Sequence, residues 1–181
     1  MKRVIIPLAE GFEEIEAVTT IDVLRRAGIE VITVGLDTDT VKGAHNIKIG
    51  TDKRLKEVLN YDFDAVVLPG GMPGAANLRE SSELLKLIKN IDAKKGLIAA
   101  ICAAPMVLEA AGVLNNKKAT SYPGYDSEIK SANYSEDRVV VDRNLITARG
   151  PGVAVEFALE IVKYLTGEGE AFSLKKAMLV K

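Results

Sequence analysis

Short apolar segments alternate with segments of helical periodicity along this chain, and no other feature of the sequence constrains the fold as strongly. The strand-like segments are residues 4–6, 29–34, 65–68, 97–101 and 145–148. The helical patterns cover residues 14–27, 82–91, 103–111 and 154–165. Strands that alternate with helices form right-handed βαβ units. We therefore predict one compact α/β domain, residues 1–181, with a mainly parallel sheet covered by helices on both faces.

Smaller elements are expected around these units. The patterns are typical of a hairpin within residues 41–49, a short helix at 53–59, a hairpin turn at 142–144 and a last amphipathic segment at 170–178. We expect residues 82–91 to form an exposed helix. The first helix is richer in apolar residues than a lone solvated helix needs, which favours a homodimer; these residues are Ile15, Val18, Ile21 and Leu24.

Composition excludes several functional classes. With 24 Lys and Arg against 25 Asp and Glu, the net charge of −1 gives no field that would hold nucleic acid or an anionic membrane. One Cys and one His cannot supply a disulfide, a Cys-based zinc site or a multi-histidine metal centre. We therefore expect no metal and no cofactor. The sequence lacks a signal-peptide pattern and any apolar run near the ~18 residues of a membrane helix, so the expected location is the cytoplasm.

Three strand ends carry residues suited to chemistry. The segments 9–16, 69–74 and 100–105 follow the first, third and fourth strands of the expected sheet. In an open parallel sheet these ends meet at one edge, where α/β proteins bind ligands. Neither the dinucleotide glycine pattern nor the phosphate-binding loop pattern is present. We therefore predict a site of another kind, built from these three segments.

Cys102 is the leading candidate for a reactive residue. Ala100 and Ala104 lie two positions before and after it, as a tight nucleophile elbow between a strand and a helix requires. The N–H groups of the following helix would favour the thiolate, so we expect a thiol pKa within the ~3.5–7.5 range of such cysteines. An inert core thiol is the alternative. No base is adjacent, because Ala103 follows and the only imidazole, His45, lies in the expected hairpin.

Other candidates rest on weaker patterns. Favourable charge in a first helical turn explains Glu13 and Glu14. Glu16 lies on the adjoining turn, near the face that Ile15, Val18 and Ile21 are expected to turn inward, where burial beside a thiolate would keep it protonated. Gly70 and Gly71 either end a strand or present an N–H group to an oxyanion together with that of Ala103. The segment Arg149-Gly150-Pro151-Gly152 either lines the same cleft or only begins the last long helix.

Taken together, these motifs resemble the ThiJ/PfpI superfamily, which is class I glutamine amidotransferase-like, in the branch of the parkinsonism-associated protein (DJ-one) and bacterial YajL. Each motif is weak alone, but the ordered set is specific and spans nearly the whole chain. The matching segments are Gly11-x-Glu13-Glu14-x-Glu16 and residues 25–28, 67–71, 96–103, 134–139, 149–152 and 176–181.

The resemblance implies a flavodoxin-like three-layer sandwich and a homodimer built partly on the first helix. It places the reactive thiol at Cys102, protonated Glu16 at its sulfur, and oxyanion-hole N–H groups at Gly71 and Ala103. The family is associated with glyoxalase III-type conversion of methylglyoxal to lactate, with protein deglycation and with oxidative-stress sensing. The leading hypothesis is therefore a cofactor-independent cysteine enzyme that acts on small reactive carbonyls. The alternative is a non-enzymatic stress sensor or chaperone that acts through oxidation of Cys102.

Departures from the family pattern also bear on function. The protease-like branch has His directly after the nucleophile, and Ala103 occupies that position here, so a protease or amidase is the least favoured reading. Tyr122 replaces a His that many animal members carry near the thiol. His45 aligns with an Arg thought to reach the partner's site. Tyr122, His45 and the 149–151 segment are therefore counted as possible pocket residues, together with Gly70.

Overall fold

Seven strands form one sheet in the computed structural model, which describes all 181 residues. In their order across the sheet, the strands are β10 (Val139–Asp142), β11 (Leu145–Ala148), β7 (Leu97–Ile101), β6 (Ala65–Leu68), β1 (Arg3–Leu8), β2 (Glu30–Gly35) and β5 (Lys53–Arg54). All neighbours pair in parallel except β10 and β11, which form an antiparallel hairpin. The prediction of a mainly parallel sheet is confirmed.

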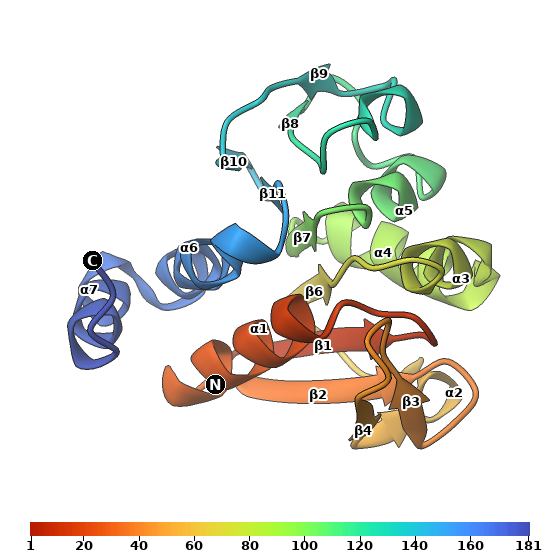
Figure 1. The fold of residues 1–181 in the computed structure, drawn as a ribbon, viewed down its shortest axis with the longest axis horizontal. Coiled ribbons are helices and arrows are strands. Elements are labelled where there is room, and N and C mark those ends of the chain that lie inside the picture. The colour runs from red at the N-terminus through yellow and green to blue at the C-terminus, as the bar shows by residue number, and fades with distance from the viewer.

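Helices cover both faces of this sheet (Figure 1). One face packs against α1 (Glu14–Arg26) and α6 (Ala154–Thr166), and α7 (Glu168–Ala177) packs against α6. The other face packs against α2 (Leu55–Val58), α3 (Gly74–Glu80), α4 (Ser82–Ala93) and α5 (Pro105–Ala110). The two cores arise because successive residues of a strand point to opposite faces. In β7, for example, Ile98 and Ala100 belong to one core and Ala99 and Ile101 to the other.

The shorter elements lie outside the seven-stranded sheet. Strands β3 (Thr40–Lys42) and β4 (Lys48–Gly50) form the expected small hairpin. Strands β8 (Lys118–Ala119) and β9 (Asn133–Tyr134) pair in parallel, with the 3₁₀ helix η1 (Asp126–Glu128) between them. A second 3₁₀ helix, η2 (Pro151–Val153), leads into α6. None of the helices has the length and apolar character that crossing a bilayer requires.

Several predicted elements differ in detail. Residues 53–59 divide between β5 and α2, and α5 begins at Pro105 rather than at residue 103. Helix α4 is not simply exposed, because its apolar stripe is buried against the sheet; this stripe consists of Leu84, Leu87, Ile88 and Ile91. Helix α3 was not expected, since its sequence of Gly-Ala-Ala-Asn-Leu-Arg-Glu has almost no apolar periodicity.

Candidate active site

The three predicted strand ends meet at one edge of the sheet, because β7, β6 and β1 are neighbours and run in parallel. Main-chain hydrogen bonds join the segments that follow them. The Glu13 N–H donates to the carbonyl of Gly70 at 2.9 Å. This bond joins the loop after β1 to the loop after β6. Its acceptor residue, Gly70, lies next to Cys102, the residue that follows β7.

Cys102 stands in a sharp turn between β7 and α5. Its φ of 65° lies in the left-handed region, which is unfavourable for residues with a side chain. Two main-chain bonds hold it there: the Cys102 N–H donates to the carbonyl of Ala148, and the Tyr122 N–H donates to the carbonyl of Cys102, both at 2.9 Å. Cys102 is partly exposed and packs against one of the two hydrophobic cores. The predicted nucleophile elbow is present.

Glu16 is the buried acid of this site. Its side chain is 0% exposed, and its Oε2 accepts a hydrogen bond from the N–H of Gly70 at 2.8 Å. Glu16 is thus buried as expected, but the spacing argument behind that expectation is wrong, because Ile15 and Val18, which were expected to face inward, are exposed. Gly70 shows how close the carboxyl and the thiol lie: a Cβ at this position would be 2.7 Å from the Cβ of Cys102 and 2.8 Å from Oε2 of Glu16. Only glycine fits between the two reactive groups.

Burial governs the acidity of Glu16. It raises the pKa of the carboxyl to about 7, with a further contribution from the charge of Glu13, against the hydrogen bonds from Gly70 and Cys102. A carboxyl with this pKa exchanges its proton near neutral pH. It can therefore serve as acid and as base under ordinary conditions.

Contrary to the prediction of an acidic thiol, the pKa of Cys102 is raised, to about 12, by burial and by the charge and hydrogen bonding of Glu16. The N–H groups of Ala103 and Gly71 act in the opposite direction. The expected helix contribution is weak because α5 starts three residues after the sulfur, at a proline that has no N–H group. The raising effect of Glu16 depends on its charge. Ionised Glu16 therefore opposes the thiolate in addition to burial, protonation of Glu16 removes that part of the opposition, and the two groups titrate as a pair.

Two backbone N–H groups point at the Cys102 sulfur, one from Ala103 and one from Gly71. Gly71 has a φ of 87°, a conformation that glycine adopts without strain. Both residues are thus placed where the sequence motifs expected them. Donors fixed by the backbone can also stabilise negative charge on an oxygen bound beside the sulfur.

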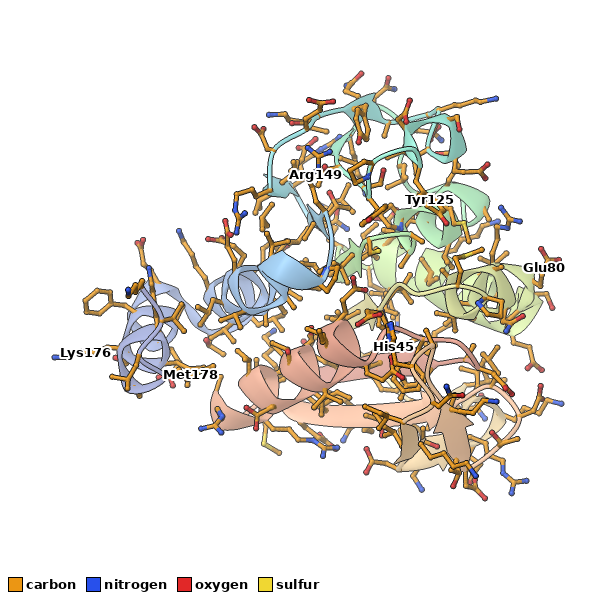
Figure 2. All side chains as sticks on the ribbon, in the orientation of Figure 1. His45, Glu80, Tyr125, Arg149, Lys176 and Met178 are labelled. Carbon is orange, nitrogen blue, oxygen red and sulfur yellow. The ribbon has the colours of Figure 1, made fainter.

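His45 lies against the first turn of α1 (Figure 2). Its ring Nδ1 is 2.9 Å from Oε2 of Glu14 and 3.4 Å from Oε2 of Glu13. The hydrogen bond to Glu14 and the charges of both carboxylates raise the pKa of His45. Burial acts to raise the pKa of Glu14, but hydrogen bonds from the His45 side chain and from backbone N–H groups lower it below its ordinary value. His45 therefore contacts acids of its own chain.

The group formed by Glu13, Glu14 and His45 is the one place where ligand atoms could gather around a metal ion, within 4.8 Å of one another. Its oxygens are already engaged, because Glu14 Oε1 accepts from the His45 N–H at 2.7 Å and Glu13 Oε1 from the Ile15 N–H at 3.3 Å. The sequence had assigned both carboxylates to favourable helix-end charge. Their burial and their contact with His45 were missed, since the hairpin that carries His45 is distant in sequence.

The remaining pocket candidates are Tyr122, between β8 and η1, and residues 149–151, which follow β11. The ring of Tyr122 lies over Gly150, where an added Cβ would be 3.2 Å from the Tyr122 Cδ2. Tyr122 is 46% exposed and stands edge-on to Tyr125. The Arg149 guanidinium donates to the carbonyl of Glu136 at 2.8 Å, on the β10–β11 side of the molecule (Figure 2). Arg149 is thus tied to the 134–138 segment, and Pro151 begins η2 beside it.

The raised pKa of Glu16 makes folding stability depend on pH. A carboxyl whose native pKa lies above its ordinary value of 4.5 favours the folded state most at low pH, and this contribution is lost as pH rises through about 7. The Glu16→Gln variant lacks this titration. We expect the free energy of unfolding of the variant, relative to wild type, to increase by about 3 kcal/mol between pH 4.5 and 8. Denaturant unfolding across this range measures it, and parallel pH profiles of the two proteins would contradict it.

Comparisons with known proteins show which family and which fold this chain is similar to. The profile of a family described as the DJ-1/PfpI family matches residues 2–164. The chain is 44% identical over 182 residues to Protein dj-1beta of Drosophila melanogaster, covering 99% of this chain and 97% of that protein. It is 41% identical to the Glutathione-independent glyoxalase DJR-1.2 of Caenorhabditis elegans, covering 93% and 91%.

A solved structure described as Toxoplasma gondii DJ-1, oxidized, has the same fold. Its TM-score is 0.96 at 38% identity, with 99% of this chain and 98% of that chain covered. The predicted flavodoxin-like α/β fold is therefore confirmed.

The bond from the Cys102 N–H to the carbonyl of Ala148, which holds the elbow, was not predicted from the sequence, because a main-chain contact leaves no side-chain signal.

Proposed function

Since this chain belongs to the DJ-1/PfpI family, we propose that it is a cofactor-independent cysteine enzyme that converts 2-oxoaldehydes such as methylglyoxal into 2-hydroxy acids such as lactate. The observation that carries the proposal is the contact between the single thiol and a buried carboxyl whose pKa is about 7. The relative named as a glutathione-independent glyoxalase supports it. Release of lactate from methylglyoxal by the purified protein, without glutathione, tests it.

The first step is addition of the Cys102 thiolate to the aldehyde carbon, while Glu16 holds its proton. The N–H groups of Gly71 and Ala103 stabilise the oxygen, which takes up a proton to complete a hemithioacetal. Glu16, as carboxylate, then removes the hydrogen from the former aldehyde carbon, and the ketone oxygen takes up a proton to give an enediol. Protonation of the neighbouring carbon, with loss of the hydroxyl proton from the former aldehyde carbon, yields the thioester of lactate. Water hydrolyses this thioester and regenerates Cys102, so the net change is addition of one water to methylglyoxal.

The same first step would also serve a deglycase, because glycated amines and thiols pass through related carbonyl adducts. A sensor function is the second candidate, and the oxidised state named for the Toxoplasma relative favours it. In that case hydrogen peroxide oxidises the Cys102 thiolate to sulfenate, a second equivalent oxidises the sulfenate to sulfinate, and each peroxide is reduced to water. Lactate formation separates these functions, since a sensor produces none.

We also propose that the chain forms a homodimer through the start of α1. Ile15 is 57% exposed, Val18 48% and the hairpin residue Ile47 56%. Leu24, which the sequence pattern had included, is 0% exposed and belongs to the core of its own chain. The exposed members of the predicted set, Ile15 and Val18, therefore lie in the N-terminal half of α1, next to Ile47 of the neighbouring hairpin.

Light scattering should give twice the 19.5 kDa chain mass at micromolar concentration. Ile15→Glu would place a carboxylate on each side of this contact, and we expect it to shift the protein to the monomer. Phe172→Glu is the matched control, because Phe172 is 69% exposed but lies on α7. A wild-type monomer, or an equal effect of the control, would contradict the proposed interface.

A further inference from the structure

The exposed imidazole of His45 lies against two buried carboxylates at the start of α1 (Figure 2). The His45 side chain is 69% exposed, whereas those of Glu13 and Glu14 are 12% and 6% exposed. The ring Nδ1 is 3.4 Å from Oε2 of Glu13 and 2.9 Å from Oε2 of Glu14. A positive charge on the ring therefore faces two negative charges that have little contact with solvent. Opposite charges at such distances favour the ionised state of both partners.

Main-chain contacts fix this arrangement independently of the imidazole. The His45 N–H donates to Oε1 of Glu14 at 2.7 Å, and the Ala44 N–H donates to the carbonyl of Phe12 at 2.8 Å. A Cβ at Gly43 would collide with the Glu14 carboxylate, so the backbone of this loop passes as close to α1 as it can. The loop should therefore stay in place when the side chain at position 45 is changed.

Glu13 is also linked to the acid of the candidate active site. Its N–H donates to the carbonyl of Gly70 at 2.9 Å, and the Gly70 N–H donates to Oε2 of Glu16 at 2.8 Å. The negative charge of Glu13 opposes ionisation of Glu16 and so contributes to its raised pKa. Glu13 therefore acts on two titrating groups, the exposed ring of His45 and the buried carboxyl of Glu16.

We propose that His45 is a positioning residue for the Glu16–Cys102 pair, because its protonated ring offsets the charge of Glu13 and thereby favours ionised Glu16. When the ring loses its proton, the charge of Glu13 is no longer offset, and Glu16 keeps its own proton to a higher pH. Ionised Glu16 opposes the thiolate, so the charge on His45 affects the pH range in which the thiolate forms. This consequence rests on the proposed function, whereas the coupling between the two groups does not require a substrate.

Other charged groups around this site are already paired or lie outside the core. On the hairpin, Lys42 pairs with Glu10 at 3.1 Å, and Lys48 is exposed. The segment 69–73 after β6 contains no ionisable side chain. Helix α6, which packs against α1, carries three charged residues, none of them buried: Glu156, Glu160 and Lys163. His45 is the one cationic side chain that pairs with Glu13.

The composition of the chain makes this coupling measurable from both sides. His45 is the only histidine, so its ring signals in an NMR titration need no further assignment. The ¹³C carboxyl signal of Glu16 is assigned by its loss in Glu16→Gln. A coupling free energy acts equally on both partners, so each titration predicts the other.

The first set of variants changes the charge at position 45. His45→Gln is neutral but keeps an N–H donor for Glu14, whereas His45→Arg is charged at every pH of the titration. We expect His45→Gln to raise the pH midpoint of Glu16 by about half a unit, a modest shift because the ring is exposed, and His45→Arg to lower it. Lys48→Gln is the matched control, since it removes a positive charge from an exposed position of the same hairpin and should leave the midpoint unchanged.

The second set removes a negative charge and follows His45. Glu16→Gln should lower the midpoint of the His45 ring by about the same half unit, because a neutral amide no longer favours the protonated ring. Glu13→Gln should lower the midpoints of both His45 and Glu16, since the charge of Glu13 raises the pKa of each.

Equal Glu16 midpoints in His45→Gln and His45→Arg overturn the inference, because altered packing rather than charge would then be the cause. An equal shift in Lys48→Gln, or an unchanged His45 midpoint in Glu16→Gln, does the same. These titrations use no substrate. Absence of lactate formation would therefore count against the proposed function alone, while the midpoints decide the role of His45.

Discussion

Replacing Cys102 with serine should abolish lactate formation from methylglyoxal, with a loss of at least about 10³-fold in kcat/KM. A serine hydroxyl at this position has no neighbouring histidine to activate it, since Ala103 follows and His45 is engaged with Glu14. The fold should persist, because serine is close to cysteine in size and needs no new space at the partly exposed elbow. Lactate assay and thermal unfolding of the two proteins measure these outcomes.

This experiment has an internal control in the sequence. The chain contains a single cysteine, so no other thiol can contribute to turnover or to labelling. Residual activity near wild type in Cys102→Ser would show that the reaction does not pass through a thiol adduct. No turnover by either protein would favour the sensor function over the enzyme.

Replacing Glu16 with glutamine should reduce turnover by about 10²–10⁴-fold while the thiol remains reactive, because an amide cannot exchange the proton of the enediol step. Glutamine retains the size of the side chain and an oxygen to accept from Gly70. It also carries no charge. Cys102 should therefore become more acidic than in wild type, since the charge of Glu16 is one cause of its raised pKa.

Turnover and thiol titration in the same variant separate the two roles of Glu16. A lower thiol pKa with lost turnover indicates acid–base catalysis, whereas wild-type turnover would remove Glu16 from the proton-transfer steps. Glu16→Asp is the companion variant. It keeps an exchangeable proton but withdraws the carboxyl by one methylene from Gly70 and Cys102, so we expect partial turnover and a changed rate of oxidation to sulfinate.

The sequence predicts the frame of the site because that frame depends on local patterns. The run from Leu97 to Ile101 is short, apolar and followed by small residues, which is enough to predict both β7 and the elbow at Cys102. The apolar spacing in α1 does not predict the burial of Glu16, because Ile15 and Val18, which it placed inward, are exposed. The meeting of three strand ends follows from the parallel topology.

The acidity of the thiol could not be predicted in the same way. It depends on Glu16, which lies 86 positions before Cys102 in the sequence. In the fold the two residues lie close together, on either side of Gly70. The helix end that the sequence pattern placed at the sulfur begins instead at Pro105. The contact of His45 with Glu14 likewise depends on a hairpin fold-back over 31 positions. Local periodicity carries no information on such long-range contacts.

At position 102, the residue that best suits the left-handed backbone conformation is not the residue that the proposed chemistry needs. A φ of 65° costs a residue with a side chain roughly 1–2 kcal/mol, which glycine avoids. A mutation from cysteine to glycine would thus relieve the main chain while it removes the nucleophile. Loss of the reactive residue in a relative would leave the architecture intact or firmer. A high structural similarity score therefore does not report whether a family member is active, and residue 102 has to be inspected in each one.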